Sequence, residues 1–429
     1  MLVEFSVENY RSILNRQTLS LAASGYYKDL EQLNTFDPGL IERLPRLLRS
    51  SVIYGPNASG KSALVRALNF MRDSVINSAK ESQANEEIDT QPFKLTAASR
   101  AGDSEFEVIF IEEGIRYQYG FRYNKQRFTE EWLFAYPEGR AQRWFQRAYD
   151  PATGRDEYRF STAFRGGRKR QDWRDQTRAN ALFLSTALQL NNQQLKPVLN
   201  WFQQRLRVMG PHLTMVGPGY TINCCKDDAQ KQRVLDFLNS AGLSISDIHI
   251  RTELFSPDLL PKDMPVALRD EITQQMTGKE VVKVSFLHED MENHELIEFS
   301  DDEESDGTRA LFAFAGPWLD VLENKRVLVV DELDTSLHPL LVHYLVKRLH
   351  HQDSQAQLIF TTHDTTILSQ KILRRDQVWF MEKNDKHSTQ LYPLSDFSPR
   401  DNEAIERGYL NGRYGGIPFL KDLDFYGHG

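Results

Sequence analysis

The chain of 429 residues has only two cysteines, Cys224 and Cys225, and they are adjacent. Neighbouring cysteines rarely form a disulfide, and two thiols alone do not make a zinc site, so we expect idle thiols. No apolar run approaches the roughly 20 residues of a membrane span, and Met1–Phe5 reads as a strand rather than a signal peptide. These absences predict a cytoplasmic protein with no membrane partner.

An excess of positive charge is also missing, because the formal net charge is −8. Nucleic acid is therefore not attracted by the surface as a whole, and any such contact must be a local patch. No heptad register persists, which excludes a long coiled coil. Apolar residues make up 40% of the chain and charged residues 26%, an ordinary globular balance. The length allows two or three domains.

One segment matches the pattern G-x-x-x-x-G-K-[ST], the loop that wraps nucleotide phosphates. It consists of Gly55, Pro56, Asn57, Ala58, Ser59, Gly60, Lys61 and Ser62. A short apolar strand, Ser51–Tyr54, precedes it, and apolar residues follow at helical spacing. The glycines allow backbone N–H groups to face the phosphates. Lys61 is predicted to reach the β and γ phosphates, and the Ser62 hydroxyl to bind Mg²⁺. A chance match is the alternative, and the strand–loop–helix context argues against it.

A second segment, the aliphatic strand Val327–Val330, ends in Asp331 and Glu332. Asp331 is predicted to hold Mg²⁺, and Glu332 to polarise the attacking water as the general base. The alternative is that two acids end a strand in solvent. Another acid, Asp334, and a helix led by Pro339 follow, and this specific arrangement favours the catalytic interpretation.

Two further candidates lie near these motifs. His363 follows the strand Gln357–Thr361, where it could hydrogen-bond a γ-phosphate. A lone histidine at a strand end is more often structural, but its order after the two motifs favours function. Ser305 and Gly307 precede a helix whose N-terminus could bind a phosphate. The same S-x-G-T turn is also a common helix cap, and both interpretations stay open.

The pattern of strands and helices predicts an α/β fold. Phe106–Ile111, Tyr117–Phe121 and Trp132–Tyr136 indicate an antiparallel meander, and the last third alternates strand and helix. We expect an ATPase lobe at 1–190, a mainly helical insertion at 191–280 and a second lobe part at 281–429. The lobe is predicted to combine a mixed sheet carrying the phosphate loop with the β-meander.

The order of these motifs resembles the ABC-type ATPase heads of the SMC-like and OLD-like group. Within that group the chain is similar to bacterial anti-phage defence ATPases of the OLD, Septu or PARIS type. The resemblance rests on an opening strand, Walker A, a variant signature, Walker B with a D-loop, and a switch histidine: Phe5–Ile13, Gly55–Ser62, Ser305–Thr308, Val327–Asp334 and His363. The signature departs from the family at Glu304, where Leu is usual, and at Asp306, where Gly is common.

The resemblance implies a head-to-tail homodimer, or a higher homo-oligomer, that sandwiches two ATP molecules with Mg²⁺. Ser305 and Gly307 of one subunit would contact the ATP held by the other. Asp334 would act in the D-loop, and Arg11 would reach the nucleotide. For the switch glutamine that binds the metal, Gln189 is the first candidate and Gln91 the rival.

The same resemblance implies an ATPase, converting ATP and water to ADP and phosphate, that senses infection or scaffolds a separate effector. The effector would be a nuclease or toxin encoded nearby, since we find no nuclease motif in a strand–helix context after His363. The alternative is an SMC-like DNA-repair ATPase that clamps DNA through Arg165–Arg170, a segment that otherwise reads as a solvated loop. A nucleotide-gated hub with negligible turnover is a further class, which the intact Lys61, Asp331 and Glu332 disfavour.

Overall fold

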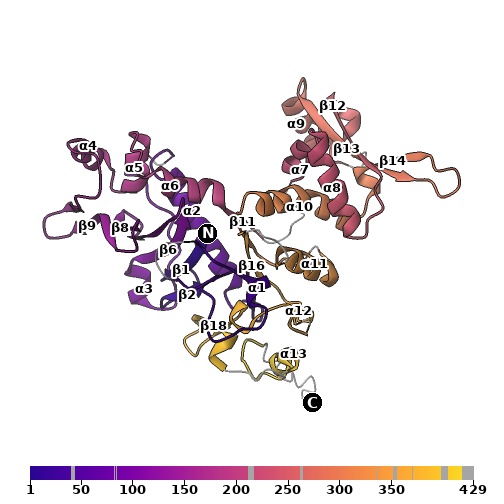
Figure 1. The fold of residues 1–429 in the computed structure, drawn as a ribbon. Helices are drawn as coiled ribbons and strands as arrows, with labels where there is room; N and C mark the ends of the chain where they lie inside the picture. The colour runs from indigo at the N-terminus through magenta and orange to yellow at the C-terminus, as the bar shows by residue number, and fades with distance from the viewer. Residues whose placement is uncertain are drawn as a thin grey trace, which may run out of the picture. The chain divides into compact units, whose positions relative to one another are not determined.

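The computed structural model describes residues 1–39, 44–81, 83, 85–210, 217–260, 264–335, 337–350, 355–369, 371–397 and 404–417. The chain divides into two compact units (Figure 1). Unit 1 comprises residues 1–212 and 321–429, and unit 2 comprises residues 213–320. The predicted insertion at 191–280 differs from unit 2 at both ends. Residues 206–209 form a strand of unit 1, and the strands between 280 and 300 pair with a strand of unit 2.

The first sheet of unit 1 is antiparallel throughout and confirms the predicted meander. Tight turns connect its central strands; Glu113 and Gly114, for example, both have positive φ, of 50° and 75°, as a two-residue hairpin turn requires. In spatial order the strands are β10 (Arg155–Phe160), β9 (Gln142–Asp150), β8 (Phe128–Tyr136), β7 (Ile115–Tyr123), β6 (Ser104–Glu112), β1 (Leu2–Glu8) and β2 (Gln17–Ser20).

The second sheet of unit 1 is mixed, as predicted for the sheet that carries the phosphate loop. Five of its strands run parallel and β18 is antiparallel. In Ser50–Tyr54, Val327–Val330 and Gln357–Thr361 every residue is buried, without alternation, which is typical of a parallel sheet covered on both faces. In spatial order the strands are β11 (Leu206–Met209), β15 (Val327–Val330), β16 (Gln357–Thr361), β5 (Ser50–Tyr54), β17 (Val378–Lys383) and β18 (Thr389–Pro393).

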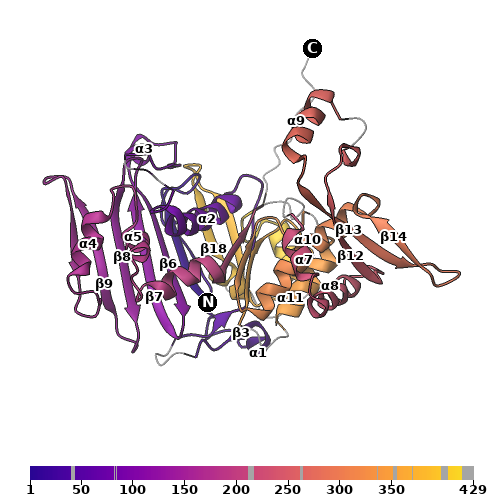
Figure 2. The same ribbon diagram turned by 90° about the horizontal axis from the view of Figure 1, so that it is seen from above.

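Helix α2 (Lys61–Asn77) joins the two sheets into one core. Its apolar side chains recur at helical spacing, and Phe70 packs on the meander with ring centroids 5.3 Å from Phe106 and 4.9 Å from Tyr123. Figure 2 shows β6 to β9 side by side, with α4 and α5 against this sheet. The remaining elements of unit 1 are α1 (Glu31–Asn34), β3 (Thr35–Phe36), β4 (Leu47–Leu48), α3 (Ala97–Ala101), α4 (Lys169–Gln176), α5 (Phe183–Gln189), α6 (Lys196–Asn200), η1 (Trp201–Arg205), α11 (Pro339–His350), α12 (Thr366–Ser369), η5 (Arg375–Gln377), η6 (Leu394–Phe397) and α13 (Ile405–Leu410).

Unit 2 contains helices together with a three-stranded antiparallel sheet. Its longest helix is closely packed, because Thr221 Oγ1 accepts a 3.0 Å hydrogen bond from Gly316 N and a Cβ on Gly316 would lie 2.8 Å from Thr221. Its elements are α7 (Gly219–Cys224), α8 (Asp228–Ser240), β12 (Asp247–Leu254), η3 (Pro257–Leu259), α9 (Val266–Met276), β13 (Glu280–Glu289), β14 (Leu296–Ser300), η4 (Asp301–Glu303) and α10 (Asp306–Glu323), whose last turn extends into unit 1.

The lack of a disulfide between the cysteines and the absence of a membrane span were both expected from the composition. Neither Cys224 nor Cys225 takes part in a disulfide. Among the helices of the described ranges, none has both the length and the apolar character needed to cross a bilayer.

Candidate nucleotide site

Three parallel strands of unit 1 bring the predicted motifs to one edge of the sheet. β5 runs into the phosphate loop, its neighbour β16 runs toward His363, and β15 runs into Asp331 and Glu332. Because the carboxyl ends of parallel strands lie at the same edge, segments almost 300 residues apart in sequence meet there. This edge is where open α/β sheets place their ligands.

The two glycines of the phosphate loop are required by their surroundings. A Cβ on Gly55 would lie 2.3 Å from the carbonyl oxygen of Met381. Gly60 has a φ of +115°, and a Cβ there would lie 2.2 Å from Thr389 Oγ1. A side chain at either position would therefore displace neighbouring atoms, and at Gly60 it would also strain the backbone. The loop is held against the hairpin of β17 and β18, which the motif alone does not predict.

Lys61 begins α2, and its side chain turns back over the loop. The ammonium nitrogen donates hydrogen bonds to the carbonyl oxygens of Gly55, at 2.7 Å, and Pro56, at 3.3 Å. Desolvation lowers the pKa of Lys61, and the nearby carboxylates, Asp331 first among them, oppose this shift. Ser62, the next residue of the helix, is half-buried. A cation at this helix N-terminus suits an anionic ligand.

Asp331 and Glu332 are fixed by one hydroxyl on the neighbouring strand. Thr361 Oγ1 donates to Asp331 Oδ1 at 2.8 Å and accepts the N–H of Glu332 at 2.7 Å. Glu332 has a φ of 54°, a left-handed conformation that is uncommon for a residue other than glycine. Such a conformation persists only where the surroundings impose it. The Glu332 Oε2 atom accepts a hydrogen bond from Thr335 Oγ1 at 3.2 Å.

Three buried oxygens at this edge lack a hydrogen-bond partner within the described part of the chain. They are Ser59 Oγ, Asp331 Oδ2 and Asp334 Oδ1. Buried polar atoms are nearly always satisfied, and an unsatisfied one calls for a ligand or water. A carboxylate oxygen beside a phosphate loop suits Mg²⁺, which binds one or two carboxylates together with substrate phosphates. The donor set therefore fits a magnesium nucleotide.

His363 lies beside these acids. Its backbone N–H donates to Asp334 Oδ2 at 3.2 Å. Although the residue is exposed as a whole, partial desolvation of the ring lowers the pKa of His363, and the Lys61 ammonium lowers it further. The shift keeps the imidazole neutral near pH 7, so one ring nitrogen can donate a hydrogen bond while the other accepts.

Arg11 and Gln91 contact each other close to the phosphate loop. The N–H of Arg11 donates to the Gln91 carbonyl oxygen at 2.6 Å, and both residues line a pocket of about 370 Å³ together with Lys94, Lys383 and His387. Thr389 ties this region to the loop, because its hydroxyl contacts Ser12 Oγ at 2.8 Å and Ser59 O at 2.7 Å. The sequence did not single out Thr389, Ser12 or Thr361, because isolated hydroxyl residues carry no motif.

A protein-family profile described as "AAA domain, putative AbiEii toxin, Type IV TA system" matches residues 50–183 and 232–369. These ranges make up more than half of the chain and include the phosphate loop, Asp331, Glu332 and His363. The chain belongs to this AAA-domain family. No curated protein matches it.

Solved structures similar to this AAA-domain chain are distant from it. The SMC head domain from Thermotoga maritima shares 14% identity at a TM-score of 0.38, covering 91% of this chain and 98% of that one. An SMC head bound to the C-winged helix domain of ScpA shares 13% identity at a TM-score of 0.38, covering 93% of this chain and 99% of that one. The recombination mediator protein RecF with ATP shares 12% identity at a TM-score of 0.36, covering 92% of this chain and 99% of that one. Likenesses at these TM-scores assign no function.

Gln189, the first candidate for the switch glutamine, does not lie with the other site residues of the AAA-domain chain. It is exposed at the end of α5, and Ser185 of the same short helix donates to the Val75 carbonyl oxygen at 2.7 Å. Val75 lies near the C-terminal end of α2. Since an α-helix rises 1.5 Å per residue, Val75 is about 20 Å from Lys61, the first residue of this helix. The rival Gln91, next to Arg11, is the glutamine that the structure places near the loop.

The signature candidates belong to unit 2. Ser305 Oγ accepts the backbone N–H of Thr308 at 3.1 Å, so this hydroxyl acts as the N-cap of α10. Gly307 is exposed, and a Cβ on it would meet only Ser305 Oγ, at 3.7 Å. The cap and the phosphate-binding interpretations remain compatible, since a capped helix still presents free N–H groups in its first turn.

Proposed function

We propose that the chain binds ATP with Mg²⁺ and hydrolyses it to ADP and phosphate. The observation that supports this best is the convergence of the phosphate loop, Asp331, Glu332 and His363 at one sheet edge, with Asp331 Oδ2 buried and without a hydrogen-bond partner in the described residues. Membership of the AAA-domain family agrees with this reading.

Each residue has a role that its position supports. Lys61 would leave the carbonyl oxygens of its own loop for the β and γ phosphates, and Ser62 and Asp331 would hold Mg²⁺, which neutralises phosphate charge. Glu332, whose carboxylate is held by the hydrogen bond from Thr335, would accept a proton from the attacking water. A neutral His363 would donate a hydrogen bond to the γ-phosphate.

The chain would function as a homodimer or a higher homo-oligomer. In this arrangement Ser305 and Gly307 complete the site of a second copy, Asp334 lies at the junction of the two sites, and Arg11 contacts the nucleotide. The exposed Ser305 and Gly307, and the buried, unpartnered Asp334 Oδ1 among the described atoms, support an incomplete site in the single chain. ATP would then control association.

The biological role we propose is anti-phage defence, of the OLD, Septu or PARIS type, through a separate effector such as a nuclease or toxin. The family description, which names a toxin of a type IV toxin–antitoxin system, supports a defence role over a housekeeping one. ATP-driven association would hold or release the effector in the cytoplasm.

The experiment that tests this function uses Glu332→Gln, which keeps the shape of the side chain and removes the base. We expect ATP binding to persist, turnover to fall by about 100-fold or more, and ATP to stabilise the dimer in analytical ultracentrifugation. Lys61→Ala serves as the variant that loses ATP binding, and the exposed Glu271→Gln as the matched carboxylate control. Unchanged turnover in Glu332→Gln would falsify the base assignment. Capture of one stoichiometric effector with Glu332→Gln and ATP, but not with Lys61→Ala, supports the role in defence.

A DNA-clamping ATPase is the second candidate, and the basic segment Arg165–Arg170 favours it. Arg165, Arg168 and Lys169 are exposed, whereas the Arg170 guanidinium lies 5.7 Å from the Phe164 ring centroid. The exposed cations suit nucleic-acid phosphates, although Phe164 is buried and is not available for stacking on bases. ATP-dependent DNA binding that is lost on changing Arg168 and Lys169 to Glu, together with no effector in the capture experiment, would favour this candidate.

A further inference from the structure

Strand β14 of unit 2 is an exposed edge strand. The sheet order is β12–β13–β14, and within the described residues β14 pairs only with β13. All five residues of β14 are exposed, including Leu296 at 54% and Ile297 at 45%. An exposed apolar edge strand is a template for pairing with another chain, which proteins usually cover or blunt.

The register shows which backbone groups of β14 face outward. Asp290 N donates to Glu295 O at 2.8 Å, and His288 pairs with Ile297 in register. Since antiparallel pairs alternate between hydrogen-bonded and non-hydrogen-bonded, Ile297 and Phe299 bond to β13. The N–H and C=O groups of Leu296 and Glu298 therefore point to the open edge, whereas the Ser300 N–H already donates to Glu303 Oε2 at 2.8 Å. Within the described residues, Leu296 and Glu298 are thus the two positions of β14 at which an added strand could form backbone hydrogen bonds.

The segment that carries this edge is strongly acidic. Two of its carboxylates pair with cations outside it, Glu298 with Arg251 and Asp306 with Arg309. Residues 289–306 contain ten Asp and Glu and no Lys or Arg, although the whole chain has a net charge of only −8. Apolar side chains are interspersed with these acids, and Met291 is 98% exposed. A surface of this composition repels nucleic acid and attracts a partner that alternates cationic and apolar side chains.

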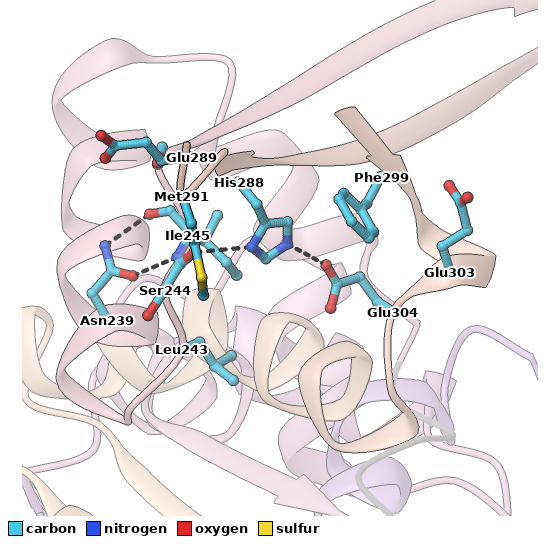
Figure 3. Close-up of a pocket in the computed structure, with 11 residues that line it drawn as sticks. Asn239, Leu243, Ser244, Ile245, His288, Glu289, Met291, Phe299, Glu303 and Glu304 are labelled. Carbon is cyan, nitrogen blue, oxygen red and sulfur yellow. Dashed lines mark hydrogen bonds and ion pairs between the residues drawn. The ribbon is translucent and has the colours of Figure 1, made fainter. Parts of the chain in front are cut away.

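A pocket of about 760 Å³ adjoins β14 (Figure 3). Its apolar walls include Leu243, Met291 and Phe299, and carboxylates of Glu289, Glu303 and Glu304 lie around it. His288 Nε2 and Glu304 Oε1 are 2.6 Å apart, and His288 Nδ1 lies 2.9 Å from Ser244 O, so this wall is internally fixed. Apolar walls with acidic groups at the rim fit a lysine or arginine, which buries its stem and keeps its charged head near water.

We propose that β14 and this pocket bind an extended, lysine- or arginine-rich segment of another protein, which adds to the sheet as a fourth strand. Main-chain hydrogen bonds along β14 would supply affinity, and alternate cationic side chains would supply specificity. The chain's own basic segment does not fit as a second copy's strand. Gly166 and Gly167 there have positive φ, of 141° and 53°, and α4 begins at Lys169. This inference is independent of ATP.

The test uses the full chain and a labelled hexapeptide of alternating lysine and valine, with an alternating glutamate–valine hexapeptide as control. Leu296→Pro removes the outward N–H without touching the bonds to β13, and Leu296→Ala removes the same side chain but keeps the N–H. We expect the lysine peptide to bind at least about tenfold more tightly than the glutamate peptide, and Leu296→Pro to weaken it about tenfold relative to Leu296→Ala. Hydrogen exchange should slow at Leu296 and Glu298 when the lysine peptide binds.

A charge variant keeps the test decisive if Leu296→Pro disturbs the sheet. Glu292→Lys with Glu295→Lys should weaken the lysine peptide, and Glu271→Lys on α9, which lies outside the surface, should not. If Leu296→Pro and Leu296→Ala bind the lysine peptide with equal affinity and the β14 amides gain no protection from hydrogen exchange, the contact depends on charge alone. That result would overturn the proposal of strand addition. Self-association of the purified chain that Leu296→Pro abolishes, or competition by DNA, would also overturn the proposal.

Discussion

The Thr361 hydroxyl bridges Asp331 and Glu332: it donates to Asp331 Oδ1 at 2.8 Å and accepts the N–H of Glu332 at 2.7 Å. With one carboxylate oxygen engaged, Asp331 presents its second oxygen, Oδ2, in a fixed direction. The same hydroxyl supports the left-handed backbone of Glu332. One side chain on β16 therefore positions both the proposed magnesium ligand and the proposed base.

Replacing Thr361 with valine should lower ATP turnover while leaving the fold intact, because valine has the same shape but no hydroxyl. Loss of such a supporting hydrogen bond typically costs about 10- to 100-fold in activity or metal affinity. Thr361→Ser keeps the hydroxyl and should remain within a few-fold of the parent. Steady-state turnover at varied Mg²⁺ measures the effect. Equal turnover in both variants would show that the bridge has no role.

The two glutamine candidates can be separated by substitution. Gln91→Ala should reduce magnesium-dependent ATP turnover by at least about tenfold, because Gln91 lies beside Arg11 near the phosphate loop. Gln189→Ala should have little effect, since Gln189 is exposed near the far end of α2. Turnover at saturating and limiting Mg²⁺ distinguishes them. The reverse order of effects would restore the sequence-based choice.

Local motifs explain which parts of the site were predictable. Gly55–Ser62 and Val327–Glu332 each combine a strand with its ligand-binding residues in one short segment, so their position at the sheet edge follows from the sequence. The hairpins of the meander were predictable for the same reason, through alternating strands and turn residues.

Contacts between distant segments explain what was missed. Thr361 and Thr389 act through hydroxyls that reach other elements, and a single hydroxyl residue has no recognisable pattern. Residues 206–209 follow a helical stretch and become a strand only by pairing with β15, about 120 residues later. The boundary of the insertion therefore depended on pairing that no local pattern records.

The pKa of His363 should depend on Lys61. Desolvation and then the Lys61 ammonium hold this pKa below its ordinary value of 6.5. Lys61→Met removes the positive charge, so the His363 pKa should rise in the folded chain, whereas Lys61→Arg should preserve the low value. Nuclear magnetic resonance titration of the imidazole without nucleotide measures both. As the pH falls through 6.5, the unfolded chain binds a proton at His363 before the folded chain does. The free energy of unfolding therefore decreases between pH 6.5 and the lower pKa of the folded chain.

Glu131 of β8 caps a helix on another segment, and its loss should be among the costliest single changes in unit 1. Its fully buried carboxylate accepts the N–H groups of Phe183, at 2.6 Å, and Leu184, at 2.9 Å, at the start of α5, which has no side-chain cap of its own. It also accepts the Tyr119 hydroxyl at 3.0 Å. Burial raises the pKa of Glu131, and the Arg147 guanidinium opposes this shift.

Glu131→Ala would leave these donors buried without an acceptor and Arg147 without one of its nearby anions. We expect a loss of about 3 to 5 kcal/mol in the opening free energy of unit 1, measured from hydrogen exchange of the β7 and β8 amides. The neighbouring Glu130→Ala is the matched control, because Glu130 forms a partly exposed 3.7 Å ion pair with Arg122 and its loss should cost under about 1 kcal/mol. Similar losses in the two variants would mean that α5 is held by apolar packing rather than by this carboxylate.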